Sequence, residues 1–417
     1  MRILVITSYY PPSRLGWGYM QLCEEVADRL AARGHVVTVL TSTYRDGPEI
    51  VRSYAVHRVL DIDPDWNEKK SAAWQFFVER RSRERRAIAR FKEVIGSLQP
   101  DIIFIWDAIG LPRALLLAAE RCASATTVYY FANYLPELPD EYIAYWQREP
   151  ARFIGKLAKG VLGRLALEQL RHEGKPVPLQ YRHAICVSQY IRQRFISQGL
   201  VPDGAVVIHN GVDLSAFTLP RAGFAAVQSD RLSCLVAGRV VPDKGVHTVI
   251  DAFGLLGQRE ETRGQASLTI LGDGPADYMQ YLRQRVTTLG INNLVDFMAP
   301  VQREQMPEVL SKHDILIVPS EYGEPIARSM QEGMAMGLLV IGTTTGGSGE
   351  LLQHEHNGLV FPAADAQSLA TQIARAGNTP GLGARLARQG QEDVRANFDI
   401  RLTVERIEDY LAGRCPR

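Results

Sequence analysis

The chain has 417 residues, of which 46% are hydrophobic, so it is long enough for two globular domains. Lysine and arginine (47) nearly balance aspartate and glutamate (46), which argues against a general electrostatic preference for nucleic acid. No run reaches about 18 apolar residues and the N-terminus lacks the features of a secretory signal, so we expect a cytoplasmic protein without a membrane span. Five scattered cysteines argue against disulfides and against a cysteine metal site.

Short apolar runs alternate with helical patterns in the first half of the chain, which is typical of parallel α/β layers. The strand candidates there are RILVIT, VVTVLT, DIIFIW, TTVYYF, HAICVS and VVIHNG. A helix is predicted over residues 19–34, with Gly34 as its end. Before it, Gly16 and Gly18 allow close backbone approach to an anion at a helix N-terminus, although a tight turn explains these glycines equally well.

Two segments interrupt this alternation. Residues 66–95 are strongly basic, and residues 147–176 mix basic with apolar positions. In the second segment, Arg152, Lys156 and Lys159 share one helical face. Such a helix either packs on its own domain with a solvated basic face, which we prefer, or lies on anionic lipid. Peripheral contact with the inner face of a membrane through 147–176 is therefore a hypothesis.

Periodicity is lost over residues 216–231, which predicts a linker between an N-terminal domain, 1–215, and a C-terminal domain, 232–399. A last helix at about 400–417 is expected to pack back on the first domain. The strand candidates of the second half are LSCLVAGR, ASLTILGDG, LVDFMAP, DILIVPS, LLVIGTTTGG and GLVFP. We therefore expect two doubly wound domains facing across a cleft, with ligands at the carboxyl ends of their strands.

The stretch SEYGEPIARSMQEGMAMG, residues 320–337, follows a strand candidate and carries acids at Glu321, Glu324 and Glu332. Pro325 suits the first turn of a helix, so Glu324 is expected at the helix N-terminus and Glu332 inside the helix. Eight helical residues span about 12 Å, which is the reach of an extended diphosphate between two sugar rings. Glu321 falls outside this spacing and is expected to be a surface acid.

Two cations follow the first strand of the second domain. In VAGRVVPDKGVHTVIDAF the strand leads to Arg239, and Lys244 precedes a helix. Arginine as a fork and lysine as a point charge can together bind two phosphates. Cations at strand ends are also common on surfaces, so this pair is not decisive alone.

Taken in order, GRVVPDKG, LTILGDGP, PSEYGEPIARSMQEGMAMG, TTTGGSGELL and NGLVFPAAD resemble the nucleotide-sugar domain of the family 4 retaining glycosyltransferases. HNGVDLSAF resembles the stretch before the linker of that family, and YYPPSRLGWG with ARGHVVTVLTS resembles its N-terminal start. The resemblance covers nearly the whole chain and implies the GT-B fold, with two Rossmann-like domains. It implies retaining transfer of a hexosyl unit from an NDP-sugar to a hydroxyl of a glycan, a lipid or a small molecule, without a cofactor or a metal ion.

The resemblance also assigns roles in the second domain. Glu324 would meet hydroxyls of the donor sugar, and Glu332 would accept hydrogen bonds from the ribose. Arg239 and Lys244 would neutralise the leaving diphosphate, so these two and Glu324 are the expected catalytic residues. The other expected donor-binding residues are Pro325, Ile326, Ala327 and Arg328, together with Gly16 and Gly18. No metal ligand is expected.

On the acceptor side the family often ends a strand with histidine or aspartate, whereas VYYFANYLPELPDEYIAYW offers Asn133. Asn133 can hydrogen-bond a sugar hydroxyl or cap the strand end. Tyr134 and the neighbouring aromatic residues fit either a carbohydrate-stacking cleft or a core. Asn133 and Tyr134 are the expected acceptor residues.

Two other classes of function stay open. A GT-B NDP-sugar epimerase or hydrolase shares the layout, although the set Arg239, Lys244, Glu324 and Glu332 argues against it. A non-catalytic nucleotide-sugar-binding subunit is compatible with the loosely matched acceptor side. Donor turnover without an acceptor product would identify the first, and tight binding without turnover the second.

Overall fold

A computed structural model describes residues 1–13, 17–62, 74–138, 141–147, 153–173, 178–217, 224, 231–258 and 266–415. The chain folds into two compact units. Unit 1 comprises Met1–Val187, Arg192–Ile208 and Val404–Arg417, and unit 2 comprises Ser188–Ile191 and His209–Thr403. Most of the expected linker, 216–231, lies outside the described residues.

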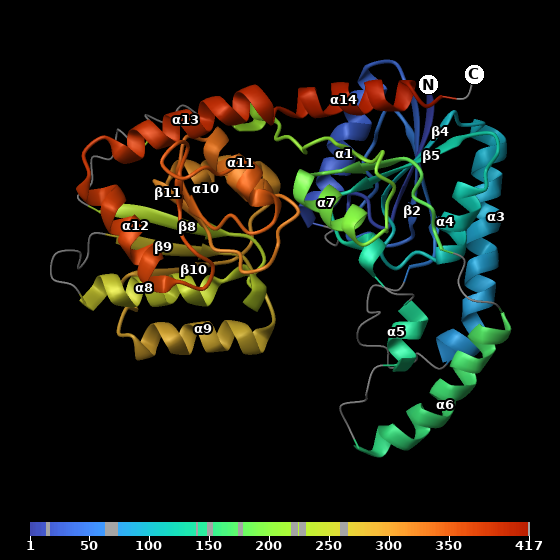
Figure 1. The fold of residues 1–417 in the computed structure, drawn as a ribbon, viewed down its shortest axis with the longest axis horizontal. Coiled ribbons are helices and arrows are strands. Elements are labelled where there is room, and N and C mark those ends of the chain that lie inside the picture. The colour runs from blue at the N-terminus through green and yellow to red at the C-terminus, as the bar shows by residue number, and fades with distance from the viewer. Residues whose placement is uncertain are drawn as a thin grey trace. The chain divides into compact units, whose positions relative to one another are not determined.

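The described part of unit 1 contains a parallel sheet of seven strands in the order β3-β2-β1-β4-β5-β6-β7. Figure 1 labels β2, β4 and β5 of this sheet. The strands are β1 (Arg2–Thr7), β2 (Val36–Ser42), β3 (Ala55–Leu60), β4 (Ile102–Asp107), β5 (Thr126–Phe131), β6 (Ala184–Cys186) and β7 (Val206–Val207). β4 is buried along its whole length, which is why it is a continuous apolar run and not an alternating one. The strand order reverses between β1 and β4, so a topological switch point lies there.

The helices of this half of the chain are α1 (Trp17–Ala32), α3 (Arg80–Leu98), α4 (Arg113–Glu120), α5 (Glu141–Gln147), α6 (Phe153–His172) and α7 (Gln189–Ser197), with a π-helical turn η1 (Gln75–Glu79) before α3 and a 3-10 turn η2 (Leu135–Glu137) after β5. α5 and α6 pack on each other, beside a small cluster of Phe76, Trp146 and Ala166 that is separate from the sheet. Because α3 follows η1 directly, the described part of the basic segment 66–95 is helical.

β3 is absent from the strands predicted from the sequence. Its residues AVHRVL place His57 and Arg58 inside the run, so no continuous apolar pattern marks it. β3 pairs with β2 and ends the sheet, and only Leu60 of the strand is buried. An edge strand needs fewer apolar residues than a central one, which explains why it was missed.

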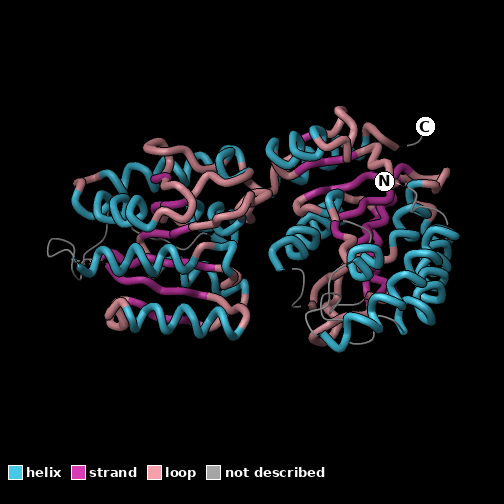
Figure 2. Tube along the Cα trace, turned by 60° about the horizontal axis from the view of Figure 1, so that its bottom comes forward, coloured by secondary structure: helices cyan, strands magenta, loops and turns pink. Residues whose placement is uncertain are grey.

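In unit 2, six parallel strands within the described residues follow the order β10-β9-β8-β11-β12-β13. They are β8 (Leu232–Ala237), β9 (Ala266–Leu271), β10 (Val295–Met298), β11 (Ile315–Val318), β12 (Leu339–Gly342) and β13 (Leu359–Val360). The order reverses between β8 and β11. In both units, helices flank the parallel strands, as Figure 2 shows, so the prediction of two doubly wound domains is confirmed.

The helices of unit 2 are α8 (Val246–Gln258), α9 (Ala276–Thr288), α10 (Met306–Ser311), α11 (Arg328–Ala335), α12 (Ala366–Asn378) and α13 (Leu382–Asn397). α8 packs between α9 and α12, whereas α11 packs on α13. Gly333 lets α11 approach β11 closely, because a Cβ there would lie 2.5 Å from Cδ2 of Leu316. α11 is thereby seated on the strand that precedes it.

The last helix, α14 (Ile400–Ala412), belongs to unit 1 from Val404 onward. Glu408 on this helix bonds Nε2 of His35 at 2.7 Å and forms an ion pair with Arg33 at 2.5 Å. The end of the chain is thereby attached to the segment between α1 and β2. No described helix is both long and apolar enough to cross a membrane.

Candidate functional site

The main candidate site of unit 2 lies where the strand order reverses. β8 and β11 are parallel neighbours that pair at Cys234 and Ile315, so the loops after them leave the same edge of the sheet. Arg239 follows β8, and Glu324 follows β11. Ligands of doubly wound sheets bind at the carboxyl ends of strands at such a switch point.

Glu324 is buried, with 5% of its surface exposed, and three side chains contact its carboxylate. Oγ of Ser320 donates to Oε1 at 2.5 Å, and the hydroxyl of Tyr322 donates to Oε2 at 2.8 Å. Nζ of Lys244 forms an ion pair with Oε1. A buried carboxylate is stable only with such partners, so the fold brings together two expected catalytic residues that are 80 positions apart. Ser320 and Tyr322 were not predicted, because their roles depend on where the loop turns.

Charged groups of both signs lie near Tyr322. Nζ of Lys244 lies 5.0 Å from the centroid of its ring. Burial raises the pKa of Tyr322 well above its usual range, and the charge of Glu324 adds to this, whereas Arg239 acts in the opposite direction. Arg239 is exposed, and no carboxylate in the described part of the chain pairs with it. Its guanidinium is therefore available to an anion at this edge of the sheet.

The glycine-rich loop after β12 holds the backbone of Glu324. Glu324 and Gly346 form a parallel bridge, and the N–H of Gly347 donates to the carbonyl of Glu324 at 2.7 Å. Gly346 has φ of 66°, and a Cβ there would lie 2.3 Å from the carbonyl oxygen of Glu324. Only glycine permits this approach, so TTTGGSGELL supports the backbone of Glu324.

Glu321 is not the surface acid that was expected. Its Oε1 accepts a hydrogen bond from Thr248 Oγ1 at 2.7 Å and lies 3.3 Å from Nε2 of His247. Its N–H donates to the carbonyl of Asp243 at 2.9 Å. Because Thr248 and Asp243 flank Lys244, Glu321 joins the loop after β11 to the loop that carries this lysine.

The expected helix start at Pro325 is wrong. α11 begins at Arg328, and Ala327, its N-cap residue, has extended backbone angles. The bridge from Glu324 to the loop after β12 holds the chain outside the helix at this point. Pro325 and Ile326 therefore lie in a loop, and the separation of Glu324 from Glu332 is not that of eight helical residues. Glu332 lies one helical turn after Arg328.

Of the two glycines expected near the donor, Gly16 lies outside the described residues. Gly18 lies in the first turn of α1, which begins at Trp17, and not in the loop before it. Gly18 belongs to unit 1, whereas the expected donor residues from Arg239 to Glu332 belong to unit 2.

On the expected acceptor side, Asn133 acts as a cap. Its Oδ1 accepts from the N–H of Leu135 at 3.0 Å, and its Nδ2 donates to Oδ1 of Asp107 at 3.2 Å. The ring of Tyr134 lies under the guanidinium of Arg194, 5.1 Å from the ring centroid. Both side chains are half-buried and remain candidates for contact with a ligand.

Asp107 is a residue that the sequence did not single out. It ends β4 at the switch point of unit 1 and is 8% exposed. Burial raises its pKa to about 6, while hydrogen bonds from Ile109 N–H and Asn133 hold the value down. The available signal was an acid directly after five buried apolar residues, DIIFIWD. In the described residues, no group of three or more His, Cys, Asp or Glu side chains could hold a metal ion.

Two family models match the chain. The model of the glycosyl transferases group 1 matches residues 225–393, and that of Glycosyltransferase Family 4 matches residues 21–216. The two matches together extend over most of both units. The chain belongs to glycosyltransferase family 4. It is an enzyme that takes a sugar from a nucleotide sugar.

This glycosyltransferase has relatives along its full length. An uncharacterized glycosyltransferase of Methanocaldococcus jannaschii is 25% identical, over 94% of this chain and 93% of the relative. A GDP-mannose-dependent alpha-(1-6)-phosphatidylinositol monomannoside mannosyltransferase of Mycobacterium tuberculosis is 24% identical, over 99% of this chain and 98% of the relative. The crystal structure of Anabaena HepE in complex with UDP and glucose covers 99% of this chain and 100% of its own, with a TM-score of 0.68 and 19% identity. These similarities identify the fold of this glycosyltransferase as GT-B.

We expect Asp107→Asn to stabilise the glycosyltransferase at pH 8 but not at pH 4. The folded pKa of Asp107 lies above the usual value of 3.8, so the wild type loses stability as pH rises from about 4 to about 6. A shift of this size corresponds to roughly 2–3 kcal/mol. Asparagine keeps an oxygen for Ile109 and Asn133 and does not ionise. Urea unfolding of both proteins at the two pH values measures the difference in their free energies of unfolding. A difference that does not depend on pH would contradict the prediction.

Proposed function

We propose that this glycosyltransferase transfers a hexosyl unit from a nucleoside diphosphate sugar to a hydroxyl of a glycan, lipid-linked or small-molecule acceptor, with retention of configuration and without a metal ion. The observation that carries the proposal is the ion pair of Lys244 with the buried carboxylate of Glu324 at the switch point of unit 2, with Arg239 after the same strand as Lys244. The relative from Mycobacterium tuberculosis is named as GDP-mannose-dependent, and the HepE crystals hold UDP and glucose. These names support a nucleotide sugar as the donor.

The two cations supply the charge that the leaving group requires. As the bond from the anomeric carbon to the diphosphate breaks, negative charge grows on the departing oxygen. Arg239 has no competing carboxylate among the described residues, and Lys244 has only one proton donor committed to Glu324. Preorganised positive charge at this position stabilises the transition state in the role that a metal ion has elsewhere.

Retention follows from attack on the face that the diphosphate leaves. The acceptor oxygen forms its bond to the anomeric carbon as the bond to the diphosphate oxygen breaks, and the proton of the acceptor hydroxyl passes to that departing oxygen. No side chain needs to form a bond to the sugar. Glu324 holds hydroxyls of the donor, because its carboxylate is fixed at the loop by Ser320 and Tyr322.

Glu332 and the start of α11 complete the donor side. The positive end of α11, which begins at Arg328, favours a phosphate. Glu332, one turn further along, can accept two hydroxyl donors from a ribose. Glu324 and Glu332 thus serve the two ends of one donor, the sugar and the nucleoside.

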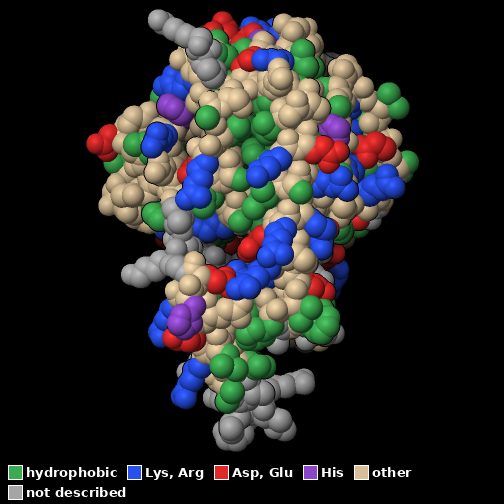
Figure 3. Space-filling view, turned by 90° about the vertical axis from the view of Figure 1, so that its right-hand side faces the viewer, with side chains coloured by type: hydrophobic (Ala, Val, Ile, Leu, Met, Phe, Trp, Pro, Cys, Tyr) green, Lys and Arg blue, Asp and Glu red, His purple; other side chains and the backbone are tan. Residues whose placement is uncertain are grey.

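We also propose a weak peripheral contact with a membrane. Arg152 and the side chain of Lys156 lie outside the described residues, and Lys159 stacks over Tyr145 at 4.4 Å, so the basic face predicted for 147–176 is only partly described. Val161 and Leu165, one turn apart on α6, are each 57% exposed. Figure 3 shows, on one side of unit 1, hydrophobic side chains below a group of Lys and Arg side chains. Apolar residues beside cations suit an interfacial helix.

The first test concerns the two cations and begins with the donor. A thermal-shift panel of UDP-, GDP- and ADP-sugars identifies the donor, since a tight ligand raises stability by mass action. With that donor, we expect Arg239→Ala and Lys244→Ala each to lower kcat by about 10²-fold or more. Arg388→Ala, an exposed arginine of α13, is the matched control and should leave kcat unchanged. Near-normal rates in both site variants, with circular dichroism unchanged, would refute the assigned role.

The second test separates the two glutamates. Glu332→Gln should weaken binding of the free nucleoside diphosphate, because the contact with ribose exists without the sugar. Glu324→Gln should leave that affinity unchanged and lower the rate of sugar transfer, because Glu324 contacts the sugar and not the nucleoside. Calorimetric titration with the nucleoside diphosphate alone measures its affinity for each variant. Equal loss of affinity in both variants would show that the division of roles is wrong.

The third test concerns the membrane. We expect the protein to sediment with anionic vesicles at low salt and to be released at high salt, since each cation near an anionic surface contributes about 1 kcal/mol and salt screens it. Val161→Asp with Leu165→Asp should reduce sedimentation, whereas Met298→Asp, an exposed apolar residue of unit 2, should not. Protein that stays in the supernatant with anionic vesicles at low salt would exclude the contact.

A further inference from the structure

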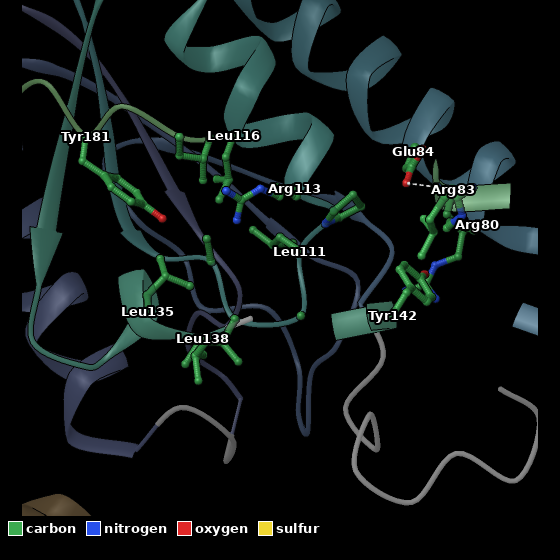
Figure 4. A pocket seen from close by; sticks show the side chains of 16 residues that line it. Arg80, Arg83, Glu84, Leu111, Arg113, Leu116, Leu135, Leu138, Tyr142 and Tyr181 are labelled. Atoms are coloured by element: carbon green, nitrogen blue, oxygen red, sulfur yellow. Dashed lines mark hydrogen bonds and ion pairs between the residues drawn. The ribbon is translucent and has the colours of Figure 1, made fainter. Parts of the chain in front are cut away.

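Unit 1 contains a cavity that the donor chemistry does not use. It lies between the loop after β4, the start of α3, α5 and Tyr181 (Figure 4). Its interior volume of ≈ 100 Å³ is several times the roughly 10–15 Å³ that one water molecule requires. Part of its wall is apolar, with Leu111, Leu116, Leu135 and Leu138 around it. Such a wall suits a hydrocarbon chain.

The charged residues among those that line the cavity are three arginines and one glutamate. Arg80 is buried and neutralised, because it pairs with Glu173 and, at 3.4 Å, with Glu84. Its guanidinium also lies 4.9 Å from the ring centroid of Phe76. Arg80 is therefore a structural residue, because its charge is already neutralised within the protein.

Arg83 and Arg113 are different. In the parts of the chain that are described, neither forms an ion pair or a side-chain hydrogen bond, and Nε of Arg113 is buried without an acceptor. Figure 4 shows the guanidinium of Arg113 among Tyr181, Leu116 and Leu111. A half-buried guanidinium beside apolar side chains is costly without an anion, and arginine forms its strongest hydrogen bonds with phosphate and carboxylate.

The cavity also lies beside the acceptor side of unit 1. The residues from Ala108 to Arg113 that form its wall directly follow Asp107 at the switch point. Aromatic contacts lead away from it toward the surface. Tyr142 in the wall touches Phe76, with ring centroids 5.4 Å apart, and Phe76 touches Phe77, which is 38% exposed, with centroids 4.9 Å apart. An apolar chain can thus leave the cavity along an apolar surface.

We propose that this cavity binds a phosphorylated lipid, with the hydrocarbon chain among the leucines and the phosphate on the guanidinium of Arg113. Arg83 adds positive charge at the same cavity. The ligand is the acceptor or its lipid carrier, so the inference rests on the proposed transfer to a lipid-linked hydroxyl. The proposal separates two phosphate sites, because the donor diphosphate uses residues of unit 2.

Calorimetric titration of the full chain with octyl phosphate tests the proposal, with octanol and inorganic phosphate as the two half-ligands. We expect octyl phosphate to bind at least about tenfold more tightly than either half, because it uses both the apolar wall and the guanidinium. Arg113→Gln should lower its affinity about tenfold, to that of octanol, and Arg83→Gln should have a smaller effect. Leu138→Asn, at an exposed position of the wall, should weaken octyl phosphate and octanol alike.

The matched control is Arg121→Gln, an exposed arginine at the other end of α4, which should bind octyl phosphate as the wild type does. Equal affinity for octyl phosphate and either half, no loss in Arg113→Gln, or an equal loss in Arg121→Gln would overturn the proposal. Thermal shifts with UDP, GDP and ADP on the same variants report the donor site separately. If none of these nucleotides shifts the melting temperature of the wild type while octyl phosphate still binds, the proposed sugar transfer is refuted and the proposed lipid cavity is not. In transfer assays with a lipid-phosphate-linked sugar, Arg113→Gln should raise KM for the acceptor and leave KM for the donor unchanged.

Discussion

The ion pair between Lys244 and Glu324 joins the two loops of unit 2 where we propose that the donor binds. A carboxylate with 5% exposure is costly to bury without a cation and hydrogen-bond donors, and removing one member of such a pair leaves the other uncompensated. The pair therefore fixes the loop after β8 against the loop after β11. Glu321 and Thr248 repeat this connection beside it. The side chains that hold this switch point together include those to which we assign the chemistry.

Unit 1 places a carboxylate at its own switch point by other means. Asp107 is as deeply buried as Glu324 but is held by neutral donors, the N–H of Ile109 and the amide of Asn133. Without a cation, burial raises the pKa of Asp107 to about 6. The two switch points thus present different electrostatics. One concentrates positive charge, which suits a diphosphate, and the other holds an acid that changes charge near neutral pH.

Much of the fold could be predicted from the sequence because continuous apolar runs mark the central strands, whereas edge strand β3 carries His57 and Arg58 and has no such mark. Arg239, Lys244 and Glu324 could be singled out because they stand in short motifs after strands. The helix start was misplaced because a contact with Gly346, 22 positions after Glu324, holds the chain extended. No local pattern encodes such a contact. Asp107 was missed because one acid at a strand end resembles many others.

The hydrogen bonds that join the loops after β8, β11 and β12 have a kinetic consequence. Glu324 is held through its side chain by Lys244 and through its backbone by Gly347, so the loops where we propose that the donor binds are connected to one another by the fold itself. Binding then requires little loss of loop entropy, and encounter rates should vary little from one nucleotide sugar to another. We expect donors to differ instead in residence time, because a poorly fitting base or sugar dissociates sooner.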